Sequence, residues 1–278
     1  MASVCKRTQR TEGVKRPMIT PKFRSKKNGV PILSKDEINA IAEAFVGDFQ
    51  CTALENPEPI DVEAFLEIYR GLTPDFQYLS HNGIYLGMTV FNDTDKVPVY
   101  IPQLNCADYI SAKARTVIID RRLIEDDRQE HRLRFTQAHE GGHDIFHYNY
   151  FHRDPNQLSF LEADTAPIIQ CRTDMGSNQR RVDPKYWTDK ESMEWQANAF
   201  SSAFLMPRPT VRKVFEIEGR TGGRCKQIAK TINSLVAECN VSSEAALYRL
   251  CDLKMIEQHE ASNYRPGSIY LDFPDFLS

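Results

Sequence analysis

Five consecutive residues, His139-Glu140-Gly141-Gly142-His143, form an H-E-x-x-H motif in a segment with helical periodicity. Residues four apart lie on one face of a helix, so the two histidine side chains can point toward one position. Two imidazoles at this spacing are suited to bind Zn²⁺, and the glutamate between them would lie beside the ion as a general base. The motif therefore predicts a helix that carries metal ligands.

A catalytic zinc site usually takes three protein ligands and one water molecule, so another element must supply the third ligand. The next predicted helix begins at Thr188, which forms a capping box with Glu191, and this helix offers Glu191 and Glu194. His147 continues the face of the two motif histidines. Eight residues of helix span about 12 Å, so His147 is too far from His139 to share one ion, and we expect it to have a structural or supporting role.

Two blocks of sequence give the chain a more specific resemblance. Residues 134–143 read R-F-T-Q-A-H-E-G-G-H, and residues 194–200 read E-W-Q-A-N-A-F, with L-M-P following at 205–207. In this order they resemble the ImmA/IrrE family of zinc metallopeptidases, whose patterns are R-F-T-x-A-H-E-x-G-H, E-x-x-A-N/D-x-F-A and L-L-M-P. The resemblance covers roughly residues 34–257.

The resemblance implies roles for individual residues. Glu140 would be the catalytic residue of a gluzincin-like site. His139, His143 and Glu194 would be the zinc ligands, which leaves Glu191 as a helix cap. Asn198 would hold a zinc-binding histidine in orientation from the second shell.

The resemblance also implies a function. Similar proteins are zinc-dependent endopeptidases that cleave helix-turn-helix transcriptional repressors, so we expect a protein substrate and an anti-repressor of a mobile element or stress regulon. An alternative remains, because residues 240–250 resemble the second helix of a helix-turn-helix. On that alternative the chain is a DNA-binding or protein-binding regulator that uses its C-terminal helices, with a structural zinc and no turnover.

The hydrophobic pattern predicts an α+β fold, with a small, mostly antiparallel sheet packed on a zincin-type active-site helix and a helical C-terminal part. We expect a helix from Ser34, capped with Glu37, and a short one after Asp61 that stops at Gly71. The other expected helices are 129–148, 188–206, 209–218, 224–238 and 243–257, and the expected strands are 76–79, 84–91, 97–101 and 109–120. Gly141 and Gly142 suggest that another backbone or a substrate strand passes close to the motif helix.

Four regions follow from this pattern. They are a basic disordered tail (1–33), a zincin-like domain (34–207) with an insertion at 149–187, a helical, helix-turn-helix-like subdomain (208–260) and an extended tail (261–278). The net charge is −3 for the whole chain and +8 for residues 1–30, which leaves −11 for the remainder. An acidic body argues against direct nucleic-acid binding, except through the basic tail.

Seven scattered cysteines without a C-x-x-C pair indicate reduced thiols. Neither a secretory signal nor an apolar run of membrane-spanning length is visible, so we expect a cytoplasmic protein with no membrane partner. Cys171 lies in the insertion and could occupy the open metal position to keep the enzyme latent, although an inert thiol is the default interpretation.

Overall fold

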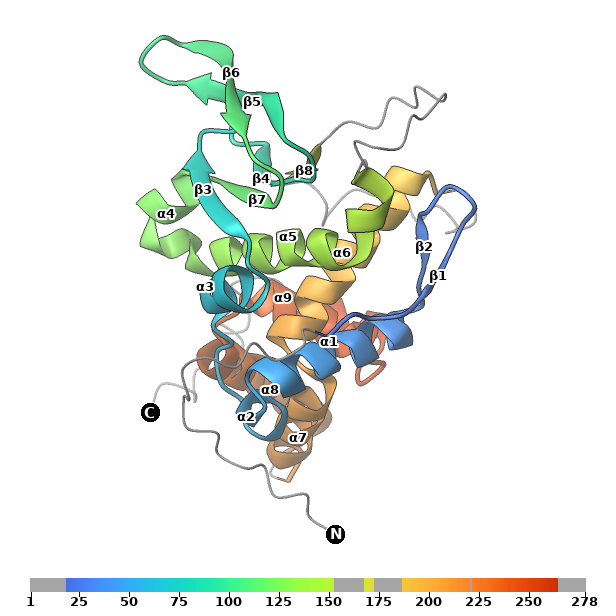
Figure 1. The fold of residues 1–278 in the computed structure, drawn as a ribbon. Helices are drawn as coiled ribbons and strands as arrows, with labels where there is room; N and C mark the ends of the chain where they lie inside the picture. Colours follow the sequence, from blue (N-terminus) through green and yellow to red (C-terminus); the bar gives the residue numbers. More distant parts are fainter. Residues whose placement is uncertain (1–18, 153–167, 173–186, 221, 265–278) are drawn as a thin grey trace, which may run out of the picture.

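The computed structural model describes residues 19–152, 168–172, 187–220 and 222–264. A long helix, α5 (Glu130–Phe151), lies along one face of a small sheet, and a second long helix, α6 (Asp189–Leu205), packs against it (Figure 1). The C-terminal helices lie on the side of α5 that faces away from the sheet. The predicted α+β fold with a helical C-terminal part is confirmed.

In the described part of the chain, the sheet on α5 has four strands. In spatial order they are β3 (Thr73–Gln77), β7 (Thr116–Asp120), β4 (Tyr85–Val90) and β8 (Ile168–Arg172). β3 runs parallel to β7, whereas β4 is antiparallel to both β7 and β8. All five residues of β7 are buried, which fits its apolar sequence. The strand β8 comes from the segment that was expected to be an insertion.

The prediction of one strand over residues 109–120 is wrong. The segment divides into β6 (Cys106–Ala112) and β7, and the backbone of Arg115 between them has a φ of 68°. This left-handed conformation redirects the chain between the two strands. β6 therefore pairs with β5 (Thr94–Ile101) in a hairpin that extends beyond the main sheet (Figure 1).

Local capping signals place the helices correctly. Helix α1 (Lys35–Phe49) begins after Ser34, whose hydroxyl accepts a hydrogen bond from the Glu37 backbone while the Glu37 carboxylate accepts one from Ser34. The equivalent capping box of Thr188 and Glu191 opens α6. Asp61 caps the short α3 (Val62–Ala64), which continues as a π-helical turn over Phe65–Tyr69.

The structure corrects the expectation that order begins at Ser34. A short hairpin of β1 (Arg24–Ser25) and β2 (Pro31–Ile32) precedes α1. Val30 is fully buried there beside Phe91, and both Lys26 and Asn28 bind the Asp189 carboxylate at the start of α6. Contacts with distant residues hold this polar segment, which local composition does not reveal. Residues 1–18 of the predicted tail lie outside the described residues.

The C-terminal helices share the main hydrophobic core with α1, α5 and α6. The third of the predicted C-terminal helices ends at Asp252 instead of 257, because Lys254 adopts a φ of 56°. The remaining α-helices of the described residues are α2 (Thr52–Glu55), α4 (Arg122–Glu125), α7 (Arg208–Glu218), α8 (Arg224–Cys239), α9 (Ser243–Asp252) and α10 (Gln258–Ala261). Among the described residues, the helices are all too short or too polar to cross a bilayer. Residues 265–278 of the predicted extended tail lie outside the described part.

Candidate metal centre

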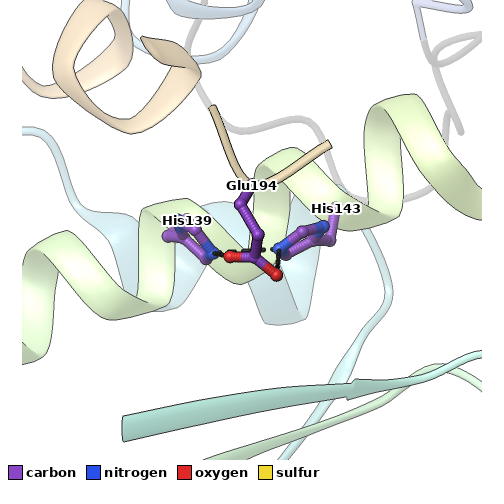
Figure 2. Close-up of side chains that lie close together, drawn as sticks. All are labelled: His139, His143 and Glu194. Atoms are coloured by element: carbon purple, nitrogen blue, oxygen red, sulfur yellow. Dashed lines mark hydrogen bonds and ion pairs between the residues drawn. The ribbon is translucent and has the colours of Figure 1, made fainter. Parts of the chain in front are cut away.

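His139 and His143 project from one face of α5 toward the same point, as the motif predicts. Their Nε2 atoms lie 2.9 Å apart. Glu194, from α6, brings its carboxylate between them, with Oε2 3.4 Å from His139 Nε2 and Oε1 3.8 Å from His143 Nε2 (Figure 2). The ligand atoms of these three residues all lie within 4.8 Å of one another. Helix α5 therefore supplies two donors and α6 the third.

The spacing of these donor atoms fits a small cation. A tetrahedral Zn²⁺ with bonds of about 2.0–2.1 Å places its ligand atoms about 3.3 Å apart, and the observed separations of 2.9, 3.4 and 3.8 Å lie on both sides of that value. Both oxygens of Glu194 are buried, and neither accepts a hydrogen bond from the described part of the chain. A buried carboxylate without such bonds is costly unless a cation compensates it. The residues present therefore fit a metal ion.

The electrostatics of the cluster favour the metal-binding forms of its side chains. Burial opposes ionisation of Glu194, but the two adjacent histidines outweigh burial and hold the pKa of its carboxyl well below the usual range. Burial lowers the pKa of His143, although Glu194 partly opposes the shift. A metal binds the ionised carboxylate and the neutral imidazole, and both pKa shifts run toward these forms.

Glu140 lies beside the cluster and is fully buried. Burial and the charge of Glu194 raise the pKa of the Glu140 carboxyl to about 7, against the opposing effects of His139 and Thr89. The Thr89 hydroxyl on β4 donates a hydrogen bond of 2.5 Å to Oε2. The other oxygen, Oε1, accepts no hydrogen bond from the described residues. A carboxyl with a pKa near neutrality can both take up and release a proton.

Two residues that were not predicted from the sequence, Gly87 and Thr89, contact Glu140. A Cβ atom on Gly87 would lie 2.4 Å from Glu140 Oε1, so β4 can pass this close only because residue 87 is glycine. Thr89, two residues further, lies on the same face of the strand, where it donates to Glu140. An isolated glycine inside a strand is a known signal of close approach, so Gly87 could have been found, whereas nothing local marks Thr89.

Asn198 lies next to a motif histidine, where the resemblance predicted it. Its Oδ1 is 2.9 Å from His139 Nδ1, the ring nitrogen that faces away from Glu194. A carbonyl oxygen at this nitrogen keeps the proton on Nδ1 and leaves the Nε2 lone pair free for a cation. Glu191 caps α6, as expected, and is exposed outside the cluster.

Two further residues of the motif region have supporting contacts. His147 lies behind His143, with their Nδ1 atoms 2.8 Å apart. Arg134 donates to the backbone carbonyls of Asn240 and Ile60, so its contacts are structural. The Cα atom of Cys171 on β8 pairs with that of Gly87, but the position of its thiol lies outside the described part of the structure.

An H-E-x-x-H helix beneath a mostly antiparallel sheet, with a carboxylate added by a following helix, is the arrangement of the zincin class of metallopeptidases. Residues 175–251 match the family model described as the IrrE N-terminal-like domain of peptidase family M78. Over these residues, which include Glu194 and Asn198, the chain is similar to the ImmA/IrrE family. Helix α5 lies before the matched segment. No curated protein shows significant similarity to the chain.

Proposed function

We propose that the protein is a zinc-dependent endopeptidase that cleaves a helix-turn-helix transcriptional repressor and so acts as an anti-repressor in the cytoplasm. The observation that carries the peptidase proposal is the position of Glu140, a buried carboxyl with a pKa of about 7, beside the cluster of His139, His143 and Glu194. The repressor substrate rests on the sequence resemblance alone.

Each residue of the site has a proposed role. His139, His143 and Glu194 hold the ion, which when bound supplies Lewis-acid polarisation of a carbonyl and a lowered pKa of water. Glu140 accepts the proton of the attacking water and delivers it to the leaving amine. Thr89 fixes the Glu140 carboxylate by its hydrogen bond to Oε2. Asn198 orients His139.

The contacts of α9 weigh against the alternative of a DNA-binding regulator. Arg249 is the only lysine or arginine of this helix. It is 2% exposed and donates to the Met206 carbonyl and to Asn39 Oδ1. A recognition helix needs cationic or polar side chains that reach the nucleic acid. The Arg249 side chain instead binds α1 and the end of α6, so it cannot contact nucleic acid. We therefore favour the peptidase.

The test combines three variants with the substrate. A repressor encoded beside this gene is incubated with purified protein, with and without a chelator, and the fragments are identified by mass spectrometry. The Glu140→Gln variant should retain its zinc and lose cleavage by about 10²-fold or more. Glu194→Gln should lose zinc affinity. Glu130→Gln, at the exposed start of the same helix, should behave as the wild type.

Each arm has an outcome that contradicts the proposal. Cleavage by Glu140→Gln at the wild-type rate would show that this carboxylate is not the base. Cleavage that persists after complete zinc removal would refute the metal mechanism. An intact repressor, together with cleavage of an unrelated unfolded protein, would leave the peptidase in place and overturn only the substrate.

A further inference from the structure

A chain of buried polar groups extends from the metal cluster to the N-terminal hairpin. His143 Nδ1 lies 2.8 Å from His147 Nδ1, and His147 Nε2 lies 2.9 Å from Gln196 Oε1. Gln196 Nε2 in turn donates to the Pro31 carbonyl at 2.9 Å. The three side chains are 0–1% exposed. No step of the proposed cleavage uses this chain of contacts.

The Pro31 carbonyl fixes the direction of the hydrogen bonds in this chain. A backbone carbonyl can only accept, so the group of Gln196 that faces it must be the NH₂. The other end of the Gln196 amide is then the oxygen, which also only accepts. His147 Nε2 must therefore carry a proton and donate it to Gln196 Oε1. In a neutral imidazole the second nitrogen, Nδ1, is then a bare acceptor.

The requirements of metal binding by His143 lead to the same placement of protons. To bind a cation, His143 must present an unprotonated Nε2, so a neutral ring carries its proton on Nδ1. That proton needs an acceptor, and the atom 2.8 Å away is His147 Nδ1. His147 must then be bare at Nδ1 and protonated at Nε2. Two independent ends of the chain thus require one and the same placement of protons.

We propose that His147 is a positioning residue, which Gln196 and the Pro31 carbonyl hold in the one tautomer that turns the Nε2 lone pair of His143 toward the metal. In the opposite tautomer of His147, the proton between the two Nδ1 atoms would belong to His147 instead of His143. His143 would then carry its proton on Nε2, the atom that faces His139 and Glu194, and would exclude the ion. Since Pro31 lies in β2, the N-terminal hairpin controls the metal affinity of a site on α5 and α6.

The two motif histidines are therefore held in different ways. His139 is held by a direct contact with Asn198. His143 relies on three buried groups in series, from α5, α6 and β2. A supporting partner of a metal ligand typically contributes about 10–100-fold to metal affinity.

The test measures zinc affinity by competition with a chelator of known affinity. His147→Phe removes the acceptor for His143 and should weaken zinc binding about 10–100-fold. His147→Asn places an amide oxygen near the former Nδ1 position and should recover most of the affinity. Gln196→Leu, which breaks the chain one step further from the metal, should weaken binding in the same direction. The control Asn39→Ala removes a buried acceptor of Arg249 and should lower stability without changing zinc affinity.

A spectroscopic readout tests the tautomers directly. In side-chain ¹⁵N–¹H correlation spectra of the zinc-loaded protein, His143 should be protonated at Nδ1 and His147 at Nε2. A His147 proton on Nδ1, or wild-type zinc affinity in His147→Phe, would overturn the inference while leaving the metal site intact. A wild-type protein that binds no zinc would refute the proposed metal site itself, on which this inference rests.

Discussion

A Cβ atom on Gly142 would lie 3.2 Å from the Cα atom of Ala197, so the backbones of α5 and α6 meet here with no side chain between them. Glu194 lies one helical turn before Ala197 on α6, and Gly142 directly precedes His143 on α5. The contact therefore sets the distance between the histidines and the carboxylate. The expected close approach of another backbone is thus confirmed for Gly142, whereas a Cβ atom on Gly141 would meet the Leu66 side chain.

Gly142→Val should separate the two helices. The added side chain would meet Ala197 and the ring of Phe200, so we expect a loss of about 1–3 kcal/mol in the free energy of unfolding, together with weaker zinc binding. Gly141→Ala is the matched control, because its new methyl group meets the end of the Leu66 side chain, which can move aside. Denaturant titration and chelator competition measure the two effects. Equal zinc affinity in both variants would contradict the role of this contact.

Gly87→Ala should separate catalysis from metal binding. The new methyl group would overlap Glu140 Oε1, so the carboxylate must turn away from its position beside Thr89. We expect a fall in kcat of about 10-fold or more, with zinc content unchanged. Met88 on the same strand packs with Val97 and Ile118, and Met88→Leu serves as the control. Full activity of Gly87→Ala in a peptide-cleavage assay would show that the orientation of Glu140 is not critical.

Metal binding should stabilise the native protein. An ion that binds only the folded state stabilises it by about 2.7 kcal/mol at 100 times its Kd, which for a domain of this size raises Tm by roughly 5–10 °C. Thermal unfolding with zinc and with chelator measures the difference. The Glu194→Gln variant should lose most of the shift, and a shift of wild-type size in that variant would exclude Glu194 as a ligand.

The thiols should differ sharply in reactivity. Burial raises the pKa of Cys239 to about 12, with a smaller effect from Glu238, whereas Cys106 and Cys225 are exposed. Because the thiolate is the reactive form, alkylation at pH 8 should modify the exposed pair quickly and Cys239 only after unfolding. Peptide mapping by mass spectrometry identifies the modified positions. Rapid labelling of Cys239 in the native protein would contradict its placement in the core.

Strand β8 should compete with an extended substrate. It pairs along the edge of β4, the strand that carries Gly87 and Thr89 beside Glu140, and an extended peptide could otherwise bind this edge. One of the consecutive residues Ile169 and Gln170 must direct its N–H toward β4, and proline there removes that hydrogen bond. Proline at the residue whose N–H faces β4 should make the protein cleave faster than the wild type. Proline at the other of these two residues should have a smaller effect on the cleavage rate. Slower cleavage by both would show that β8 supports the site.

Local signals were enough to predict much of the fold and the site. The capping boxes at Ser34 and Thr188 depend on residues three apart, so the sequence alone locates the starts of α1 and α6. Likewise, His139 and His143 are four residues apart, so helix geometry alone predicts that their side chains lie on one face. Glu194 could be chosen over Glu191 only through the resemblance to a family.

The remaining features depend on contacts between distant segments. The division of β6 from β7 rests on the left-handed backbone of Arg115, a residue type that gives no warning of it. The hairpin before α1 is held by Asp189, more than 150 residues away in the chain. Likewise, no local pattern links Gln196 to the carbonyl of Pro31, so the support of His143 could not be predicted.

His139 and His143 have no exposed surface, and Glu194 is 5% exposed. An ion bound among them would lose these ligands only when the buried side chains move apart, and such movements are rare in well-packed regions. Inactivation by a chelator should therefore proceed slowly, at a rate set by the protein and not by the chelator concentration. Once loaded, the protein would keep its ion through brief periods of metal scarcity.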